Sequence, residues 1–374
     1  ARSPMPQDQM LIRVVLLLAA IVLLMLLVVA SRYRSARRNR AASPRPEADP
    51  VSTGAPPPAS AEPVPYADPG LELMTLELYR RAFGTTNFNY AALGEHQGVI
   101  NAVRNGIADA VTQREYFPRK PLIVPRLLAA MRSNDSALKE LVDIIMQDPV
   151  LTGDVLRTAN SPFYRLGKEA VDTLGRAVVI LGIEGLRSVI ATSVMQPVFQ
   201  VPKGYFENFS ATVWALAQRS ALCAQAYART TRECDSFSAH LLSLLYHVSY
   251  IVLFRLTVAK YTIASGSLPR AEVFTRLIDE VAERLAGLIA VEWQLPEPMR
   301  AALTEHAERR DVSAMSPLAR ALYHGRLCGL GGMLVEDNLQ SPEEVLALLE
   351  RKGIPADKAA AIWELTQSTG AQGA

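Results

Sequence analysis

An uninterrupted apolar stretch near the start of the sequence limits what this part of the chain can form. Residues 14–30 read VVLLLAAIVLLMLLVVA without one polar side chain. Leu11 and Ile12 extend the stretch, with Arg13 near its outer end, where its side chain can snorkel to the interface. About 20 helical residues, each rising about 1.5 Å, cross the ~30 Å hydrocarbon layer of a bilayer. A helix on the surface of a globular domain would show a polar face, which this stretch lacks. We predict a transmembrane helix over residues 11–30, after a short N-terminal tail over residues 1–10.

Five arginines follow the apolar stretch directly, within the sequence SRYRSARRNR (Arg32, Arg34, Arg37, Arg38 and Arg40). A basic cluster at this position is typical of a stop-transfer signal, and by the positive-inside rule it places the following chain in the cytoplasm. A cleavable signal peptide is the alternative, but the apolar stretch is long for one and no A-x-A cleavage site follows it. We therefore expect a single-pass protein of the inner (cytoplasmic) membrane, with its C-terminal domain in the cytoplasm.

The next segment, residues 41–69, is rich in Pro, Ala, Ser and Glu. Such a composition cannot bury enough apolar surface to fold, and its prolines favour extended stretches. Together with the basic cluster it forms a linker over residues 31–69. We predict that this linker is disordered and holds the rest of the protein away from the membrane.

The charge of the chain is unevenly distributed. Residues 1–50 hold eight arginines and three acidic residues, a balance of +5, whereas the whole chain carries +2, so the remainder carries about −3. A slightly acidic domain is a poor candidate for sequence-independent nucleic-acid binding, and no nucleic-acid partner is predicted. The three cysteines (Cys223, Cys234 and Cys328) share no CxxC spacing. Reduced, packed thiols are expected, in agreement with a cytoplasmic location.

From residue 70 onward, apolar residues recur at helical spacing and no stretch alternates as a strand does, so an all-α fold is predicted. Helix starts are marked by Asp148 followed by Pro149, and by Ser341 before Pro-Glu-Glu. Gly182 is expected to end one helix just before the next begins. The predicted helices cover residues 71–83, 95–112, 124–131, 138–147, 149–159, a helix capped by Asp172 or Thr173 and ending at 181, 183–195, 209–230, 236–257, 271–293, 296–309, 317–330, 342–352 and 356–367.

Two stretches of this helical part carry a resemblance. Residues 138–164 contain the acidic-proline helix start and a helix end of the form Leu-Arg-x-Ala-Asn-Ser, which includes Asn160 and Ser161. Residues 171–190 contain the turn LG-x-x-x-LR, which ends at Arg187. Taken together, these features resemble the HDOD family, the output-type relative of the HD hydrolase superfamily. The similarity continues more faintly through Trp214, around His247 and over residues 295–306.

The resemblance implies an all-α helical bundle of HDOD type over residues 116–310. An accessory helical segment over residues 70–115 precedes the bundle, and a helical extension over residues 311–374 follows it. The resemblance also implies a bacterial signalling role, often in networks linked to cyclic di-GMP. The helices before Thr112 are candidates for self-association as a homodimer.

Active HD hydrolases bind divalent metals through a His, an adjacent His-Asp pair and a later Asp, and the metals supply hydroxide and stabilise phosphoryl charge. At these positions the sequence has Leu216 in place of the first His, and Val248 in place of the Asp that should follow His247. A single imidazole leaves a metal incompletely coordinated. His247 therefore marks a degenerate HD position, and the sequence predicts no catalytic residue, no metal ligand and no cofactor.

The motif positions Asp148, Pro149, Asn160, Ser161 and Arg187 are expected to cap and join helices. A groove beside them that binds a partner or a small ligand is the alternative. Neither the identity of a partner nor a small-molecule ligand can be inferred from the sequence.

The favoured interpretation is a membrane-tethered, non-catalytic signalling module that recognises a protein partner. One alternative is a metal-dependent phosphohydrolase or phosphodiesterase with a divergent site built from His240, His247 and His306. His240 and His247 share a helix face but lie two turns, about 10 Å, apart, which is poor geometry for one metal. The other alternative is a receptor that binds a cyclic dinucleotide without turnover.

Overall fold

The computed structural model describes residues 69–110, 113, 116, 135–161, 164, 170–201, 203–263, 267–308 and 311–370. The chain divides into two compact units, Ala1–Val64 and Pro65–Ala374, and every described residue belongs to the second. The predicted transmembrane helix, the five arginines after it and the helix expected over residues 124–131 lie outside the described residues. So does the predicted linker, apart from Pro69.

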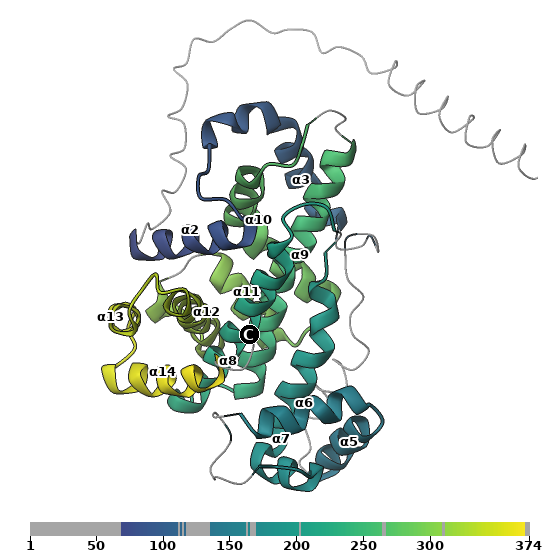
Figure 1. Cartoon of the computed structure of the whole chain (residues 1–374), viewed down its shortest axis with the longest axis vertical. Helices are drawn as coiled ribbons and strands as arrows, with labels where there is room; N and C mark the ends of the chain where they lie inside the picture. Colours follow the sequence, from purple (N-terminus) through teal and green to yellow (C-terminus); the bar gives the residue numbers. More distant parts are fainter. Residues whose placement is uncertain are drawn as a thin grey trace, which may run out of the picture. The chain divides into compact units, whose positions relative to one another are not determined.

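Within the described residues the structure contains helices and no strands, which confirms the all-α prediction (Figure 1). The elements are α2 (Pro69–Phe83), η1 (Tyr90–His96), α3 (Gln97–Ala110), α5 (Asp135–Met146), α6 (Pro149–Ala159), α7 (Leu174–Met195), η3 (Gln196–Phe199), α8 (Asn208–Thr231), α9 (Ser236–Ile263), α10 (Ala271–Glu292), α11 (Glu297–Ala307), η4 (Val312–Ala314), α12 (Pro317–Glu336), α13 (Pro342–Arg351) and α14 (Ala356–Gly370).

Several helices begin at the capping residues that the sequence predicts. The Asp148 carboxylate accepts hydrogen bonds from the backbone N–H groups of Val150 (2.8 Å) and Leu151 (3.3 Å), and Pro149 is the first residue of α6. Ser341 and Glu344 form a reciprocal capping box at the start of α13. These side chains satisfy backbone donors that have no partner inside the helix.

The boundary predicted at Gly182 is a kink inside α7. Gly182 has φ 62° and ψ −177°, whereas the residues on either side of it are helical. A positive φ is strained for residues with a Cβ atom and is readily adopted by glycine. The two predicted helices are therefore present, but they follow each other without an intervening loop.

α9 and α12 each end six residues after their predicted ends. α9 continues to Ile263, and the hydroxyl of Thr257, the predicted last residue, donates a hydrogen bond to the carbonyl of Leu253 inside the helix (2.7 Å). α12 continues to Glu336 through a glycine-rich stretch, where a Cβ atom on Gly329 would lie 2.6 Å from the backbone nitrogen of Ser220 in α8. The glycines of α12 thus permit close helix packing instead of ending the helix.

α9 is the central helix of the described unit. It contacts α3, α7, α8, α10 and α12, and every residue from Ser236 to Phe254 is buried. α9 and the span Leu174–Phe199 are both long and apolar enough to cross a membrane by length and composition alone. For α9, 89% of the apolar window is buried inside the fold, against 50% for the other span. Burial by helices on all sides accounts for the apolar character of α9.

The helices before and after the HDOD-like segment share one hydrophobic core with it. α2 packs on α8 and α12, α3 packs on α9 and α10, and α12 packs along α8 (Figure 1). The core includes Met74 from α2, Val103 from α3 and Leu349 from α13. All three cysteines are free, and Cys223 and Cys328 are buried in this core.

Candidate functional site

A group of polar side chains lies between α9, α10, α11 and α12, inside the otherwise apolar core. We call it the central polar cluster. It is connected by hydrogen bonds, ion pairs and ring contacts, and it consists of Tyr246, His247, Tyr250, Glu283, His306 and Arg326.

Arg326 of α12 is in contact with most of this cluster. Its Nη1 donates a hydrogen bond to His306 Nε2 (2.9 Å), and its Nη2 donates to the Tyr250 hydroxyl (3.4 Å). Its guanidinium carbon lies 4.0 Å from the centroid of the Tyr246 ring, and Nη1 lies 3.7 Å from Glu283 Oε1. Burial lowers the pKa of Arg326, but the neighbouring phenols and the Glu283 carboxylate raise this pKa further, to a value above the ordinary one. Arg326 is therefore a permanent cation inside the bundle.

His306 connects this cation to α10. Because a guanidinium has no acceptor, His306 Nε2 must carry the lone pair and the ring proton must be on Nδ1. Nδ1 lies 3.3 Å from Glu283 Oε1, and the imidazole side chain is 5% exposed. Burial lowers the pKa of His306; Glu283 raises it and Arg326 lowers it, and the pKa stays below the ordinary value. His306 is therefore neutral and is held between a carboxylate and a guanidinium.

His247 lies against the same two tyrosines. Its ring is edge-on to Tyr246 (centroids 5.2 Å apart) and to Tyr250 (5.6 Å), and Tyr246 also contacts the ring of His306 (5.4 Å). His247 Nδ1 donates to the carbonyl of Ser243 (2.7 Å), and among the described residues its buried Nε2 has no partner. Burial and then Arg326 lower the pKa of His247 to about 3. This imidazole is neutral throughout the physiological range.

His240 belongs to a different part of α9. Its Nε2 pairs with the hydroxyl of Thr192 in α7 (3.0 Å), and burial lowers its pKa to about 4. The structure therefore brings His247 and His306 to one cluster and directs His240 to another helix.

The metal set of the active HD hydrolases does not fit these residues. Leu216 and Val248, at two of the ligand positions, are buried apolar side chains, and a guanidinium lies 2.9 Å from His306 Nε2. In the part of the chain that the structure describes, no group of three or more His, Cys, Asp or Glu residues is placed to share a metal ion. Like unit charges 4 Å apart repel by about 4 kcal/mol at an effective dielectric constant of about 20, and a divalent ion beside Arg326 would double this cost.

The motif residues join helices at several places. Asp148 and Asn160 cap opposite ends of α6. The Asn160 amide nitrogen donates to the carbonyls of Leu156 and Val171 (2.8 Å each), and its oxygen accepts from the N–H of Val171 (2.8 Å). Asn160 therefore fastens the start of α7 to the end of α6.

The Ser161 hydroxyl and the Arg187 side chain are buried. The carbonyl of Ser161 accepts from the N–H of Tyr164 (3.1 Å), and its hydroxyl is buried. Arg187 is 5% exposed, and its guanidinium lies 5.8 Å from the centroid of the Phe237 ring. Burial lowers the pKa of Arg187, and Asp235 and Glu184 oppose this effect. A binding role for the motif residues stays a prediction.

Sequence reasoning misses the charged members of the central polar cluster. Glu283 and Arg326 lie on α10 and α12, outside the quoted motifs, and Arg326 lies beyond the HDOD-like segment altogether. One signal was available: Arg326 is the only charged residue between positions 321 and 335. A single charge in an apolar, glycine-rich helix usually needs a partner inside the fold.

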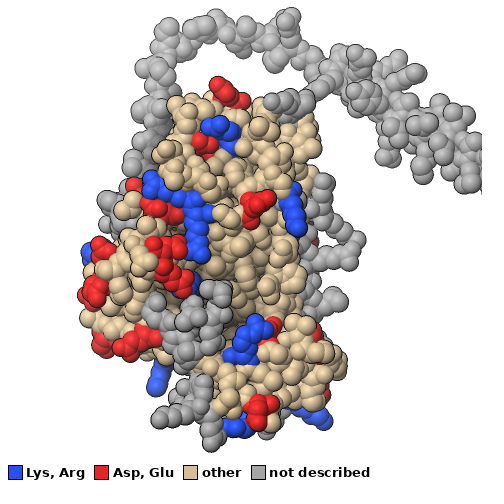
Figure 2. Space-filling model, viewed as in Figure 1, with Lys and Arg blue, Asp and Glu red and all other residues tan. Residues whose placement is uncertain are grey.

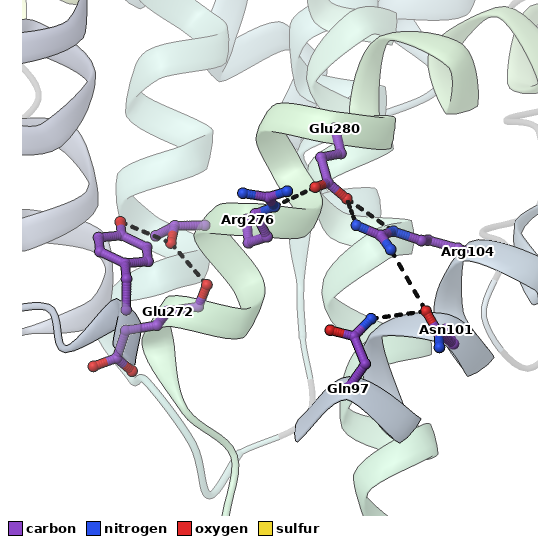
Figure 3. A network of polar contacts seen from close by, with 8 residues as sticks. Gln97, Asn101, Arg104, Glu272, Arg276 and Glu280 are labelled. Atoms are coloured by element: carbon purple, nitrogen blue, oxygen red, sulfur yellow. Dashed lines mark hydrogen bonds and ion pairs between the residues drawn. The ribbon is translucent and has the colours of Figure 1, made fainter. Parts of the chain in front are cut away.

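Three further polar features lie at the surface, outside the central polar cluster. A groove of about 470 Å³ is lined by Arg255, whose guanidinium is already bonded to the carbonyls of Tyr116 (3.5 Å), Val198 (3.2 Å) and Gln200. A polar network joins Arg104 of α3 to Glu280 of α10 (Figure 3). Acidic side chains gather over α13 and α14 (Figure 2). Exposed charge pairs contribute little to stability, and none of the three features defines a ligand.

Comparison with known proteins identifies relatives of the helical part. A curated, uncharacterized protein of Treponema pallidum is 26% identical over 199 residues, which are 52% of this chain and 37% of that protein. The chain thus spans well under half the length of this relative. A solved structure from Shewanella amazonensis, described as a candidate metal-dependent phosphohydrolase, has 17% identity and a TM-score of 0.51, covering 73% of this chain and 99% of that one. At this identity, the likeness shows the fold alone.

A second similar structure is a HDOD domain protein of unknown function from Geobacter sulfurreducens, with 22% identity and a TM-score of 0.49 over 73% of this chain and 95% of that one. The family itself is shown by the sequence match. Residues 117–309, just over half of the 374 residues, match the HDOD domain. The chain therefore belongs to the HDOD domain family.

Proposed function

We propose that this protein is a membrane-tethered signalling module that acts by binding a protein partner and does not catalyse a reaction. The observation that carries the proposal is the contact between Arg326 and His306 Nε2 (2.9 Å), because it uses an imidazole nitrogen that a metal would need. Val248 beside His247 removes a second ligand. Family membership supports a signalling role, and the degraded ligand set favours recognition over hydrolysis.

The tether in this proposal is the apolar stretch over residues 11–30. A proline-rich linker of 38 residues before α2 reaches roughly 120 Å when extended at about 3.1 Å per residue. The tethered module would meet partners at or near the inner membrane surface. A reporter enzyme fused to the C-terminus, active only in one compartment, tests this topology: activity of a periplasm-specific reporter would contradict it.

The proposed lack of catalysis is tested on the purified full chain. With Mn²⁺ or Ni²⁺ added, we expect no hydrolysis of cyclic dinucleotides or aryl phosphates above that of buffer with the same metal. His306→Ala serves as the matched variant. Turnover that depends on the metal and disappears in His306→Ala would replace this proposal with a divergent phosphohydrolase.

The proposed partner is tested by cross-linking in host membranes and purification of the full chain in detergent. The same partner should be recovered in independent preparations. Excess unlabelled purified chain, added as a competitor, should reduce its recovery. Recovery of chaperones alone would count against partner recognition.

The proposal places the module in cyclic di-GMP-linked signalling, which rests on the family resemblance. In this case the partner would bind cyclic di-GMP, and the HDOD module itself would not. Calorimetry with cyclic di-GMP should give no binding heat at ligand concentrations well above the micromolar range. Saturable heat would instead make the protein a nucleotide receptor.

A further inference from the structure

We infer that Arg326 is a protein-borne cation that takes the place of a metal ion in the central polar cluster, which contains the degenerate HD position His247, and that α12 delivers it there. The inference concerns what occupies this centre. It holds or fails independently of whether a partner is found, because its test uses the purified chain and simple metal salts.

The donors around Arg326 Nη1 are of the kinds that divalent metals bind. An imidazole nitrogen lies 2.9 Å away, at His306 Nε2, and a carboxylate oxygen lies 3.7 Å away, at Glu283 Oε1. The neighbouring Nη2 is 3.4 Å from the phenol oxygen of Tyr250. Histidine nitrogen and carboxylate oxygen bind Zn²⁺ at about 2.0–2.2 Å, so both donors would have to move closer to an ion at the Nη1 position, Glu283 Oε1 by roughly 1.5 Å.

The charge of the cluster is compensated internally. One carboxylate, Glu283, faces one guanidinium, and the π-face of Tyr246 lies 4.0 Å from the guanidinium carbon. A metal ion would add positive charge next to Arg326 without adding a carboxylate. The same side chains that hold the guanidinium therefore disfavour a metal as long as the guanidinium is present.

The backbone on either side of Arg326 is placed by close helix packing. A Cβ atom on Gly325 would lie 2.6 Å from the Cβ of Ala224 in α8, and one on Gly329 would lie 2.6 Å from the nitrogen of Ser220. These contacts fix α12 against α8, and Arg326 points from α12 to α9 and α11, where its partners lie. α12 begins at Pro317, after the matched HDOD segment ends at residue 309. The replacement cation is thus supplied from outside the family segment.

The test measures the thermal midpoint, Tm, of the tag-free full chain with and without 1 mM Mn²⁺ or Ni²⁺. The wild-type Tm should stay constant. In Arg326→Ala, which removes the guanidinium from beside His306 Nε2 and Glu283, the metals should raise Tm by about 3 °C or more. The rise should disappear in the double variant Arg326→Ala/His306→Ala.

The matched control is Arg320→Ala on the same helix. Arg320 pairs with Glu233 at the surface, 2.7 Å away and outside the cluster, so its loss should create no metal response. Arg326→Lys keeps a cation at the cluster and should also give none, whereas Arg326→Met keeps the apolar volume and should respond. Arg326→Met covers the case in which the alanine variant does not fold.

Two results would overturn the inference. A metal-dependent rise in the wild-type Tm that His306→Ala abolishes would show that Arg326 does not exclude metal from this centre. A folded Arg326→Ala or Arg326→Met without any metal response would show that the surrounding donors do not form a latent metal site.

Discussion

At the scale of single residues, the interior of this protein depends on uncharged imidazoles. Four of the five histidines have a pKa below the ordinary value, and in each case burial is the largest cause. His324 illustrates the pattern, because it is buried, lies flat against the Tyr227 ring (centroids 5.1 Å apart) and has its pKa lowered to about 4. In the unfolded chain these groups would titrate near pH 6.5.

These shifts predict acid sensitivity. Between about pH 6.5 and pH 4 the unfolded chain binds more protons than the folded protein, so stability falls as the pH falls through this window. Each such imidazole contributes up to about 1.4 kcal/mol per pH unit. Urea unfolding at pH 5.0 and 7.5 should show a lower unfolding free energy at pH 5.0, and His324→Gln should reduce the difference. A stability that is unchanged or higher at pH 5.0 would contradict the assignment of neutral imidazoles.

A second residue-scale prediction concerns Asn160. Its side chain makes three hydrogen bonds of 2.8 Å that join the end of α6 to Val171. Asn160→Ala should lower the unfolding free energy by about 1–3 kcal/mol, because it leaves part-buried backbone groups unpaired. The control is Asn101→Ala at the exposed α3 surface, which should change stability by no more than about 0.5 kcal/mol. Equal effects of the two substitutions in urea unfolding would argue against a structural role for the motif asparagine.

At the scale of elements, most helix bounds could be predicted from the sequence because their signals are local. Asp148-Pro149 marks the start of α6 with its own hydrogen bonds, and Gly182 marks the kink with its own dihedral angles. The central polar cluster could be predicted only in part. His247 and His306 can be singled out in the sequence by residue type. Arg326 comes from a different helix, α12, and no local sequence pattern predicts that α12 packs beside α9 and α11.

Two helical glycines, Gly329 in α12 and Gly287 in α10, give element-scale predictions of opposite sign. Gly329→Ala places a Cβ atom 2.6 Å from the backbone of Ser220 in α8, which cannot move aside freely. We expect a loss of about 1–3 kcal/mol or more in unfolding free energy. Gly287→Ala in α10 has no atom within 4 Å of the new Cβ and should stabilise the protein by about 0.5–1 kcal/mol. Thermal unfolding of both variants tests these two signs. An unchanged unfolding free energy in Gly329→Ala would mean that α12 is not packed tightly against α8.

At the scale of the whole molecule, the family match and the folded unit differ in extent. The match ends at residue 309, whereas the hydrophobic core continues through Leu322, Leu349 and Trp363. The helices on both sides of the matched segment cover faces of α8 and α9 that would otherwise be open to water. The sequence predicts these helices but does not show that they share the core. An apolar face predicts that a helix is buried, but it does not identify the helix against which it packs.

Removal of α12, α13 and α14 should therefore prevent cooperative folding. A chain that ends at residue 310 exposes the face of α8 that packs on α12 and leaves Glu283 and His306 without Arg326. We expect aggregation, or loss of a sharp thermal transition measured by circular dichroism. A chain that lacks only α14 serves as the control, and it should lose less stability than the chain that ends at residue 310. A truncated chain that unfolds sharply at the Tm of the full chain would show that the family segment folds by itself.

The helices that bury α9 are not all available when α9 is synthesised, because α12 is translated later. α9 is buried on every side from Ser236 to Phe254, and its cover includes α12, which leaves the ribosome about 70 residues later. At about 5–20 residues per second, the exposed helix waits roughly 4–15 s for this partner. Such a segment has the length and apolarity that the membrane-insertion machinery selects. Until translation has produced the helix that carries Arg326, the apolar window of α9 therefore lacks part of the cover that buries it in the folded protein.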